Sequence, residues 1–184
     1  MDLLTGSYVI LSKLTFEDSQ FCVRLRNSNQ GKFLNSGSKT VEEQNIWLEQ
    51  RPNNEFNYLI SDNTGGKIGI ISLIGIDDRN KRAEPSRFIM LPNVSRKNVK
   101  LVFEPLYLIY KLSFDYLELN RLQGTIAKSN EKMIKLQQYL GMEIEGVMLQ
   151  HSFINNKFED VVMISLLKNR YLAHTKKLLR SLLT

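Results

Sequence analysis

Three cationic side chains, Arg96, Lys97 and Lys100, lie in the segment 92–102, which contains neither a carboxylate nor a glycine. The segment precedes an apolar stretch that we expect to be helical, and the N-terminus of a helix attracts anions. Cations at this position could therefore bind the phosphate groups of a ligand. Three cations in a surface segment are also often merely solvated, so the sequence leaves both interpretations open.

Asn130 stands at the junction between a predicted strand, which begins near Leu122, and a predicted helix with apolar residues at 133, 134, 136 and 140. An Asn at such a junction is a favoured N-cap. Gly141 follows the helix, where a residue with positive φ closes the last turn at little cost. The pattern predicts a strand followed directly by a helix, with Asn130 between them.

Two further side chains could be reactive. His151, in the first strand of a late predicted hairpin, could carry a proton near neutral pH, although a single histidine in a strand is more often structural. Cys22 is the only cysteine, and no Cys or His cluster surrounds it. We expect a buried, unreactive thiol and a reducing compartment, the cytoplasm. No residue spacing is typical of a metal site, and we expect no metal.

The elements that must position these residues follow from periodicity and capping signals. We expect helices at 15–26 and 42–50, strands at 8–11, 57–61, 67–76 and 82–91, and a loop at 92–102. A helix at 103–117, with Pro105 in its first turn, and then a strand, a helix and a hairpin turning at 155–157 complete the domain. Early hairpins and a late crossover predict a mixed sheet.

Length and composition limit the class of protein. A chain of 184 residues with 42% hydrophobic residues suits one domain with a single core. Charged residues and a proline interrupt the longest apolar run, at 101–114, so we expect no membrane span. The N-terminal residues lack the basic start of a signal peptide.

The net charge of +6 is concentrated in the C-terminal tail. Residues 168–184 contain five cations and no carboxylate, which leaves 20 basic and 19 acidic residues in the rest of the chain. A nearly neutral domain argues against nucleic acid as a partner. We divide the chain into a domain at 1–168 and a basic amphipathic tail at 169–184. The tail could pack on the domain or on a partner subunit, contact a membrane surface, or be disordered.

The stretch from Leu122 to Leu167 resembles the GCN5-related N-acetyltransferase superfamily. The shared features are a strand, Asn130, a helix, Gly141-Met142, Glu145-Gly146, a turn rich in Asn and Lys, Asp160, and Ser165 to Lys168. The chain looks most like the branch of ribosomal-protein N-terminal acetyltransferases, which also includes sugar-nucleotide amine acetyltransferases. The resemblance implies one α/β domain of α+β type, with a mixed, mostly antiparallel sheet flanked by helices.

The resemblance implies acetyl-coenzyme A as co-substrate, without a metal. Its pyrophosphate would bind the segment 92–102, through Arg96, Lys97, Asn98, Val99 and Lys100. This segment lacks the family's glycines, for which its cations would compensate. The pantetheine arm would pair with the strand ending at Met90-Leu91, where a backbone N–H would polarise the thioester. Asn130 would contact the same arm, a role compatible with capping the helix.

The resemblance also implies the proton carriers. Glu84 would be the general base, because Ala83-Glu84 stand where the family carries Ala-Glu; an exposed charge at a strand end is the alternative. The family's acid, a tyrosine, is replaced by Gln137, and Tyr139 lies about 200° further around the helix. Water could then protonate the released thiolate, and His151 is a second candidate proton carrier.

On the acceptor side, Arg26-Asn27 and Trp47 look like the corresponding region of sugar-nucleotide amine acetyltransferases, although a Trp is more often a core residue. Asp160 would anchor loops or bind substrate. The sequence thus predicts a direct acetyl transfer to a primary amine of an amino sugar nucleotide or another small molecule. A catalytically degenerate binding or assembly protein and a protein N-terminal acetyltransferase are the alternatives. A homodimer and membrane contact by the tail stay open.

Overall fold

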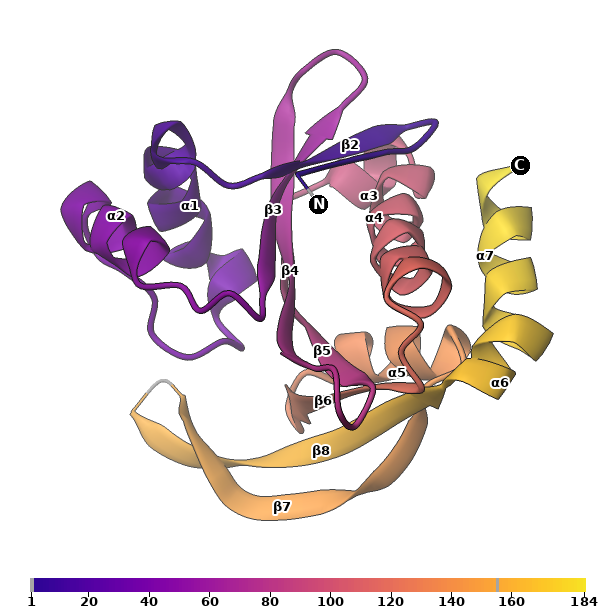
Figure 1. Ribbon diagram of the computed structural model, residues 1–184. Coiled ribbons are helices and arrows are strands. Elements are labelled where there is room, and N and C mark those ends of the chain that lie inside the picture. The colour runs from indigo at the N-terminus through magenta and orange to yellow at the C-terminus, as the bar shows by residue number, and fades with distance from the viewer. Residues whose placement is uncertain (1, 155) are drawn as a thin grey trace.

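The structure, a computed structural model, describes residues 2–154 and 156–184, and of Lys97 only the backbone. Its strands form one sheet in the order β1-β2-β3-β4-β5-β6-β8-β7 (Figure 1). The strands are β1 (Leu3–Thr5), β2 (Val9–Lys13), β3 (Phe56–Asp62), β4 (Lys67–Asp77), β5 (Arg82–Met90), β6 (Arg121–Ala127), β7 (Glu143–Ile154) and β8 (Lys157–Leu167). The helices are α1 (Ser19–Arg26), α2 (Val41–Glu49), α3 (Val94–Lys97), α4 (Lys100–Lys111), α5 (Glu131–Tyr139), α6 (Lys168–Arg170) and α7 (Lys176–Leu183).

Neighbouring strands pair antiparallel except β5 and β6, which are parallel. The predicted α/β domain with a mixed, mostly antiparallel sheet is therefore confirmed. The predicted hairpin turn at 155–157 joins β7 and β8, but Asn155 lies outside the described residues.

The two faces of the sheet carry separate cores because side chains alternate along a strand. In β3, Tyr58 and Ile60 pack in the core beneath α4, whereas Leu59 between them packs with Phe21 and Leu25 of α1. Figure 1 shows α1 and α2 on one side of β3 and β4, and α4 on the other. The sheet is thus covered on both faces in this part of the molecule.

Local capping explains where the first helices begin. The Thr15 side chain and Asp18 form a reciprocal capping box ahead of α1. Thr40 accepts a hydrogen bond from the Glu43 N–H, and the Glu43 carboxylate accepts one from the Lys39 N–H. Each pair satisfies N–H groups that the first turn of a helix leaves without partners. The predicted cap of α2 is confirmed. Thr15 also caps as predicted, but it begins a 3-10 turn at Phe16–Asp18, and α1 itself begins at Ser19.

The predicted loop at 92–102 is wrong, because most of this segment is helical. Asn93 adopts a left-handed conformation with φ of 67°, which ends the strand and lets α3 begin at Val94. The Asn98 side chain then accepts a hydrogen bond from the Lys100 N–H at 3.0 Å. Helix α4 consequently begins three residues before the predicted start. Pro105 lies in its second turn rather than its first.

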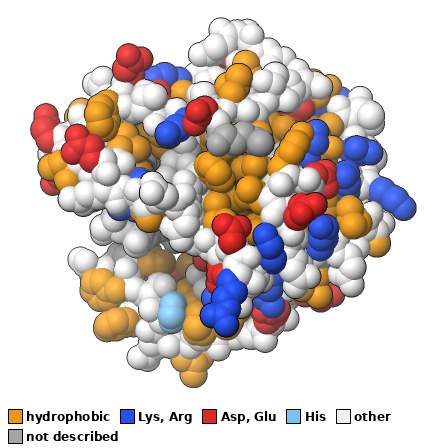
Figure 2. All heavy atoms as spheres, viewed as in Figure 1, with side chains coloured by type: hydrophobic (Ala, Val, Ile, Leu, Met, Phe, Trp, Pro, Cys, Tyr) orange, Lys and Arg blue, Asp and Glu red, His pale blue; other side chains and the backbone are white. Residues whose placement is uncertain are grey.

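The C-terminal tail is helical and packs on the domain. Leu179 of α7 is fully buried, and Leu178 and Leu182 pack against the same core as α4. Thr175 donates a hydrogen bond to the Leu140 carbonyl, and a side chain at Gly141, whose φ is 99°, would clash with the Thr175 hydroxyl. Figure 2 shows Lys and Arg side chains gathered on the right-hand side of this face, where α7 lies in Figure 1. The division of the chain at residue 168 stays a prediction.

Among the described residues, no helix is long and apolar enough to cross a membrane.

Candidate active site

The site lies where the sheet opens between its two parallel strands. β5 and β6 pair only at Arg82 with Arg121 and Ala83 with Leu122, after which they separate. A groove of about 470 Å³ fills the opening, lined by residues 84–90 of β5, by Leu91, by residues 123–127 of β6, and by part of α5. Because the sheet is split here, β5 presents a backbone edge that β6 does not cover. Such an edge can pair with an extended ligand.

The backbone edge of β5 presents one particular N–H to the groove. The Leu91 N–H donates to the Ile68 carbonyl at 2.8 Å, so Leu91 and Ile68 form a hydrogen-bonded pair of the ladder. The adjacent pair, Met90 with Gly69, must then be a non-hydrogen-bonded pair, whose backbone groups point away from the partner strand. Of the two predicted donors, only Met90 can therefore polarise a carbonyl in the groove. Leu91 contributes its side chain to the lining.

A β-bulge re-aims the strand just before Met90. Ile70 pairs with Ile89 and Ser72 with Ser86, so Arg87 and Phe88 stand opposite a single residue of β4. Arg87 has a φ of 52°, a strained conformation for a residue with a long side chain. The bulge lies two residues beyond Pro85, which still pairs regularly with Leu73. Its consequence for Arg87, which lines two cavities, was not apparent in the sequence.

Glu84 lies at the narrow end of the groove and is half-buried. Gly124 of β6 lies beside this side chain, since a Cβ atom at Gly124 would be in ordinary van der Waals contact with the Glu84 Cγ at 3.6 Å. Burial raises the pKa of Glu84, and the positive charge of Arg87 opposes that shift. A carboxylate with a raised pKa in a cleft is suited to accept a proton near neutral pH.

Asn130 lines the groove and also caps α5. Its side-chain oxygen accepts a hydrogen bond from the Met133 N–H at 3.4 Å, which leaves its amide N–H groups for another partner. The capping interpretation is therefore confirmed, and the contact with a donor molecule stays a prediction.

Asn130→Asp separates these two roles. Aspartate is also a good N-cap, but it has no N–H to donate. We expect the free energy of unfolding of the variant to stay within about 0.5 kcal/mol of the wild-type value. We expect its affinity for acetyl-coenzyme A to be several-fold weaker. Urea denaturation and calorimetry measure the two quantities. Unchanged affinity would restrict Asn130 to the role of helix cap. Asn130→Ser is the matched control, because serine also caps a helix but lacks the amide group.

The segment 92–102 offers less to a ligand than the sequence suggested. The Lys100 ammonium donates to the Tyr8 hydroxyl and to the Thr184 carbonyl, both at 2.9 Å, and so is committed to the N-terminal strands and the tail. Asn98 caps α4, and Val99 is half-exposed outside the residues that line the groove. Arg96 is exposed on α3, next to Ser95, which lines the groove. The Lys97 side chain lies outside the described part of the chain.

Gln137 occupies the position where the resemblance implies a tyrosine. It is buried, and its side-chain oxygen accepts a hydrogen bond from the hydroxyl of the fully buried Tyr110 at 2.6 Å. Gln137 lines the groove, whereas Tyr139 is exposed and contacts the ring of Phe103. The prediction that Tyr139 points elsewhere is confirmed. The contact with Tyr110 was not foreseen, because 27 residues separate the two in sequence.

Two predicted residues lie away from the groove lining. His151 is exposed on β7. Asp160 accepts hydrogen bonds from the Gln150 N–H at 3.0 Å and from the Lys128 ammonium at 3.2 Å. The first of these bonds lowers the pKa of Asp160. This carboxylate thus anchors the irregular part of β7, where Gln150 has a φ of 48°.

Two of the predicted acceptor residues lie at a smaller cavity of about 120 Å³, on the α1 side of the bulge. Arg26 and Trp47 line it, whereas Asn27 does not. The Asn27 amide donates to the Val23 and Ser38 carbonyls and accepts from Lys39, so it holds the loop after α1. Cys22 also borders the cavity, and burial raises the pKa of its thiol to about 12. The thiol is therefore protonated and unreactive at neutral pH.

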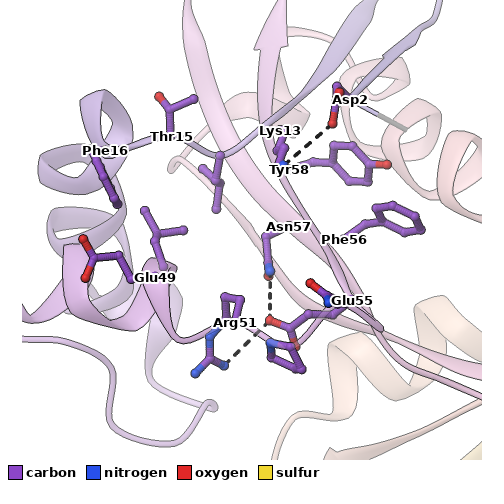
Figure 3. A pocket seen from close by; sticks show the side chains of 14 residues that line it. Asp2, Lys13, Thr15, Phe16, Glu49, Arg51, Glu55, Phe56, Asn57 and Tyr58 are labelled. Atoms are coloured by element: carbon purple, nitrogen blue, oxygen red, sulfur yellow. Dashed lines mark hydrogen bonds and ion pairs between the residues drawn. The ribbon is translucent and has the colours of Figure 1, made fainter.

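A third cavity, of about 490 Å³, lies beside β2, β3 and the end of α2 (Figure 3). Two ion pairs lie in its lining, Lys13 with Asp2 and Arg51 with Glu55. Neither β5 nor β6 lines it, so it is separate from the groove. Among the described residues, no group of three or more His, Cys, Asp or Glu side chains could hold a metal ion.

Comparisons with known proteins identify relatives of this chain. The profile of the acetyltransferase (GNAT) domain matches residues 9–143. Spermidine N(1)-acetyltransferase of Escherichia coli K12 is 30% identical over 112 residues, which are 61% of this chain and 59% of that protein. The match therefore spans less than two thirds of that relative. Spermidine N(1)-acetyltransferase of Vibrio cholerae is 28% identical over 171 residues, covering 84% of this chain and 97% of that protein.

A solved structure shares the fold. The crystal structure of spermidine N-acetyltransferase from Vibrio cholerae in complex with CoA and spermine superposes with a TM-score of 0.81. The two chains are 24% identical, and the alignment covers 91% of this chain and 99% of the other.

Proposed function

The chain belongs to the acetyltransferase (GNAT) domain family, and we propose that it transfers an acetyl group from acetyl-coenzyme A to the primary amine of a small molecule. The observation that carries this proposal is the split between β5 and β6, with Glu84 at its narrow end and the Met90 N–H facing into it. One groove thus offers a base and a donor for a developing oxyanion, the two groups that acyl transfer to an amine needs most.

In the proposed reaction, the pantetheine arm extends along β5 and its thioester carbonyl accepts a hydrogen bond from the Met90 N–H. Glu84 takes a proton from the ammonium group of the acceptor, directly or through water. The free amine then attacks the carbonyl carbon, and the tetrahedral oxyanion is stabilised by the Met90 N–H. The C–S bond breaks, and the attacking nitrogen releases its second proton to solvent water to give the neutral amide. Water protonates the coenzyme A thiolate, because Gln137 has no proton to give at neutral pH.

The acceptor is a finer question. The names of the relatives support a polyamine such as spermidine. Arg26 and Trp47, which line the smaller cavity, support an amino sugar nucleotide. One feature favours the alternative of a catalytically degenerate binding protein. In the segment 92–102, the N–H groups at 98, 101 and 102 donate within the segment and so do not face a pyrophosphate.

Titration with acetyl-coenzyme A by calorimetry tests the proposal. We expect micromolar binding that weakens as salt is raised, because Arg96 lies beside the groove and its contact with phosphate would be screened. Arg96→Ala should weaken binding about two- to fivefold at low salt and flatten the salt dependence. Lys13→Ala, which removes an exposed cation on β2, is the control and should bind like the wild type.

Each outcome has a consequence for the proposal. Binding followed by acetylation of any small amine supports the enzyme. No binding at millimolar acetyl-coenzyme A would overturn it in favour of a binding or assembly protein. Equal affinity of Arg96→Ala and the wild type at all salt concentrations would remove Arg96 from the phosphate site.

A further inference from the structure

The smaller cavity, beside the bulge of β5, brings two arginine side chains together. Arg26 reaches it from the end of α1, and Arg87 reaches it from the bulge. Burial is the main cause that lowers the pKa of both guanidinium groups. The positive charge of Arg87 lowers the pKa of Arg26 further. No carboxylate is among the residues that line this cavity. The other polar side chains of the lining are neutral: Asn35, Ser36, Ser38, Gln44, Asn57 and Ser72.

The carboxylate that forms an ion pair with Arg87, Glu55, is already committed. Its side chain is 5% exposed and lies 3.7 Å from Arg51 and 3.5 Å from Arg87, and it accepts a hydrogen bond from Asn57 at 2.9 Å. Figure 3 shows Glu55 joined to both Arg51 and Asn57 at the lower end of the neighbouring cavity. One carboxylate thus serves two guanidinium groups. The four groups Arg26, Arg51, Arg87 and Glu55 carry a net charge of about +2.

Both guanidinium groups of the cavity keep donors for a ligand. The hydrogen bonds of Arg26 come from Nη2, to the backbone and side-chain oxygens of Asn35 at 3.0 and 3.2 Å. Those of Arg87 come from Nη1, to Asn57 at 2.9 Å. Within the described part of the chain, Nε and the second terminal nitrogen of each arginine are not used. A guanidinium carries five N–H donors in a planar fork that matches a carboxylate or a phosphate.

Packing holds Arg87 in this position. Its guanidinium lies 4.9 Å from the centre of the Trp47 ring, and the bulge fixes its backbone. Trp47 therefore serves as a platform for two arginines, since Arg51 lies 4.2 Å from the same ring. Gly37 leaves space for Arg26, because a side chain there would come within 2.9 Å of the Arg26 Nε. Donors fixed before binding lose little entropy when a ligand arrives.

We propose that the amine acceptor carries an anionic group, a carboxylate or a phosphate, which binds between Arg26 and Arg87 while its amine lies at Glu84. The inference rests on the proposed acetyl transfer. Arg87 lines both cavities, so an anion bound there is adjacent to the groove. A cavity of about 120 Å³ suits a single anionic group rather than a whole nucleotide. A polycation that reached this cavity would meet two partly buried positive charges, and no carboxylate is among the residues that line it, so spermidine should be a poorer acceptor than an anionic amine.

Matched acceptors test the charge requirement. The first pair is glucosamine 6-phosphate and glucosamine, the second is γ-aminobutyrate and its uncharged amide, and spermidine is the polycation. Release of coenzyme A gives kcat/KM for each. We expect the anionic member of at least one pair to exceed its neutral partner by about tenfold or more, and the responding pair distinguishes phosphate from carboxylate. Preference for spermidine over every anionic amine would overturn the inference.

Variants test the residues. Arg26→Ala should bring the ratio of kcat/KM for the anionic and neutral members close to one, and Arg26→Lys should restore only part of it, because lysine lacks the fork. Arg24→Ala removes an exposed cation from the same helix and should keep the wild-type ratio. An unchanged ratio in Arg26→Ala would exclude Arg26 as the anion-binding residue.

A binding measurement separates this inference from the proposed acetyl transfer. Inorganic phosphate and acetate are titrated against thermal unfolding of the wild type and of Arg26→Ala. Stabilisation that Arg26→Ala abolishes supports the anion site even if no amine is acetylated, in which case the proposed transfer fails alone. Equal responses of both proteins, together with acetylation that ignores acceptor charge, would overturn the anion site and leave the transferase intact.

Discussion

Glu84→Gln should lower kcat about 10²- to 10³-fold at neutral pH, the usual contribution of a positioned general base. The amide has nearly the same shape and cannot accept the proton of the ammonium group. Because Glu84 lies at the narrow end of the groove, away from the segment 92–102, we expect the affinity for acetyl-coenzyme A to stay the same. Steady-state kinetics and calorimetry measure the two quantities on one preparation.

The pH dependence gives a second readout with a defined sign. Burial raises the pKa of Glu84 above its ordinary value of 4.5, so the base form is lost as the pH falls through this raised pKa. The acid limb of kcat/KM in the wild type should therefore lie above pH 4.5 and be absent in Glu84→Gln. The same burial favours the protonated carboxyl in the folded state. Its contribution to stability is fully present below the unfolded pKa and is lost as the pH rises through the folded pKa.

Glu49→Gln is the control for this experiment, since Glu49 is an exposed carboxylate that lines only the separate cavity of Figure 3. It should keep wild-type kinetics. Turnover of Glu84→Gln within threefold of the wild type across the pH range would remove Glu84 as the base and move attention to water or to another group.

The parts of the fold that were predicted correctly are those determined locally. Thr15 with Asp18 and Thr40 with Glu43 satisfy N–H groups three residues away, so the helix starts are encoded within one turn. Gly141 ends α5 because its φ of 99° suits glycine. Such signals do not depend on the rest of the chain, which is why periodicity and capping located most helices and strands.

The parts that were missed depend on distant contacts. Lys100 was expected to bind phosphate, but Tyr8 and Thr184, which are 92 and 84 residues away, hold its ammonium. Leu91 was expected to donate to the ligand, but its N–H is used by Ile68, and a shift of one residue in register decides which N–H is free. Three residues predicted from the sequence all line the groove: Glu84, Met90 and Asn130. The choice between the N–H groups of Met90 and Leu91, however, required the three-dimensional structure.

The largest change in stability should come from Glu104, a residue that only interrupts an apolar run in the sequence. It lies within α4 and is 3% exposed. Its carboxylate accepts hydrogen bonds from the N–H groups of Ser7, Tyr8 and Val9 at 2.7, 2.6 and 2.7 Å. One buried carboxylate thus satisfies three consecutive backbone donors at the turn between β1 and β2. Converging N–H groups of this kind compensate the loss of hydration of a buried anion.

Glu104→Gln should lower the free energy of unfolding by about 3–5 kcal/mol, because an amide nitrogen would face backbone donors that then lack an acceptor. Urea denaturation followed by circular dichroism measures the change, and Glu118→Gln, at an exposed position, should stay within about 0.5 kcal/mol of the wild type. A loss below about 1 kcal/mol would mean that water or a rearranged turn satisfies these N–H groups.

The hydrogen bonds from the N–H groups of Ser7, Tyr8 and Val9 to Glu104 form a clamp. The same variant shows how far the site depends on this clamp. Lys100, Glu104 and the β1–β2 turn together tie the start of α4 to the N-terminal strands, and this end of α4 follows the segment expected to bind phosphate. If the clamp also positions that segment, Glu104→Gln should bind acetyl-coenzyme A more weakly at a temperature where it is fully folded. If affinity is unchanged, the clamp serves stability alone, and the groove between β5 and β6 is organised by the bulge at Arg87 without help from α4.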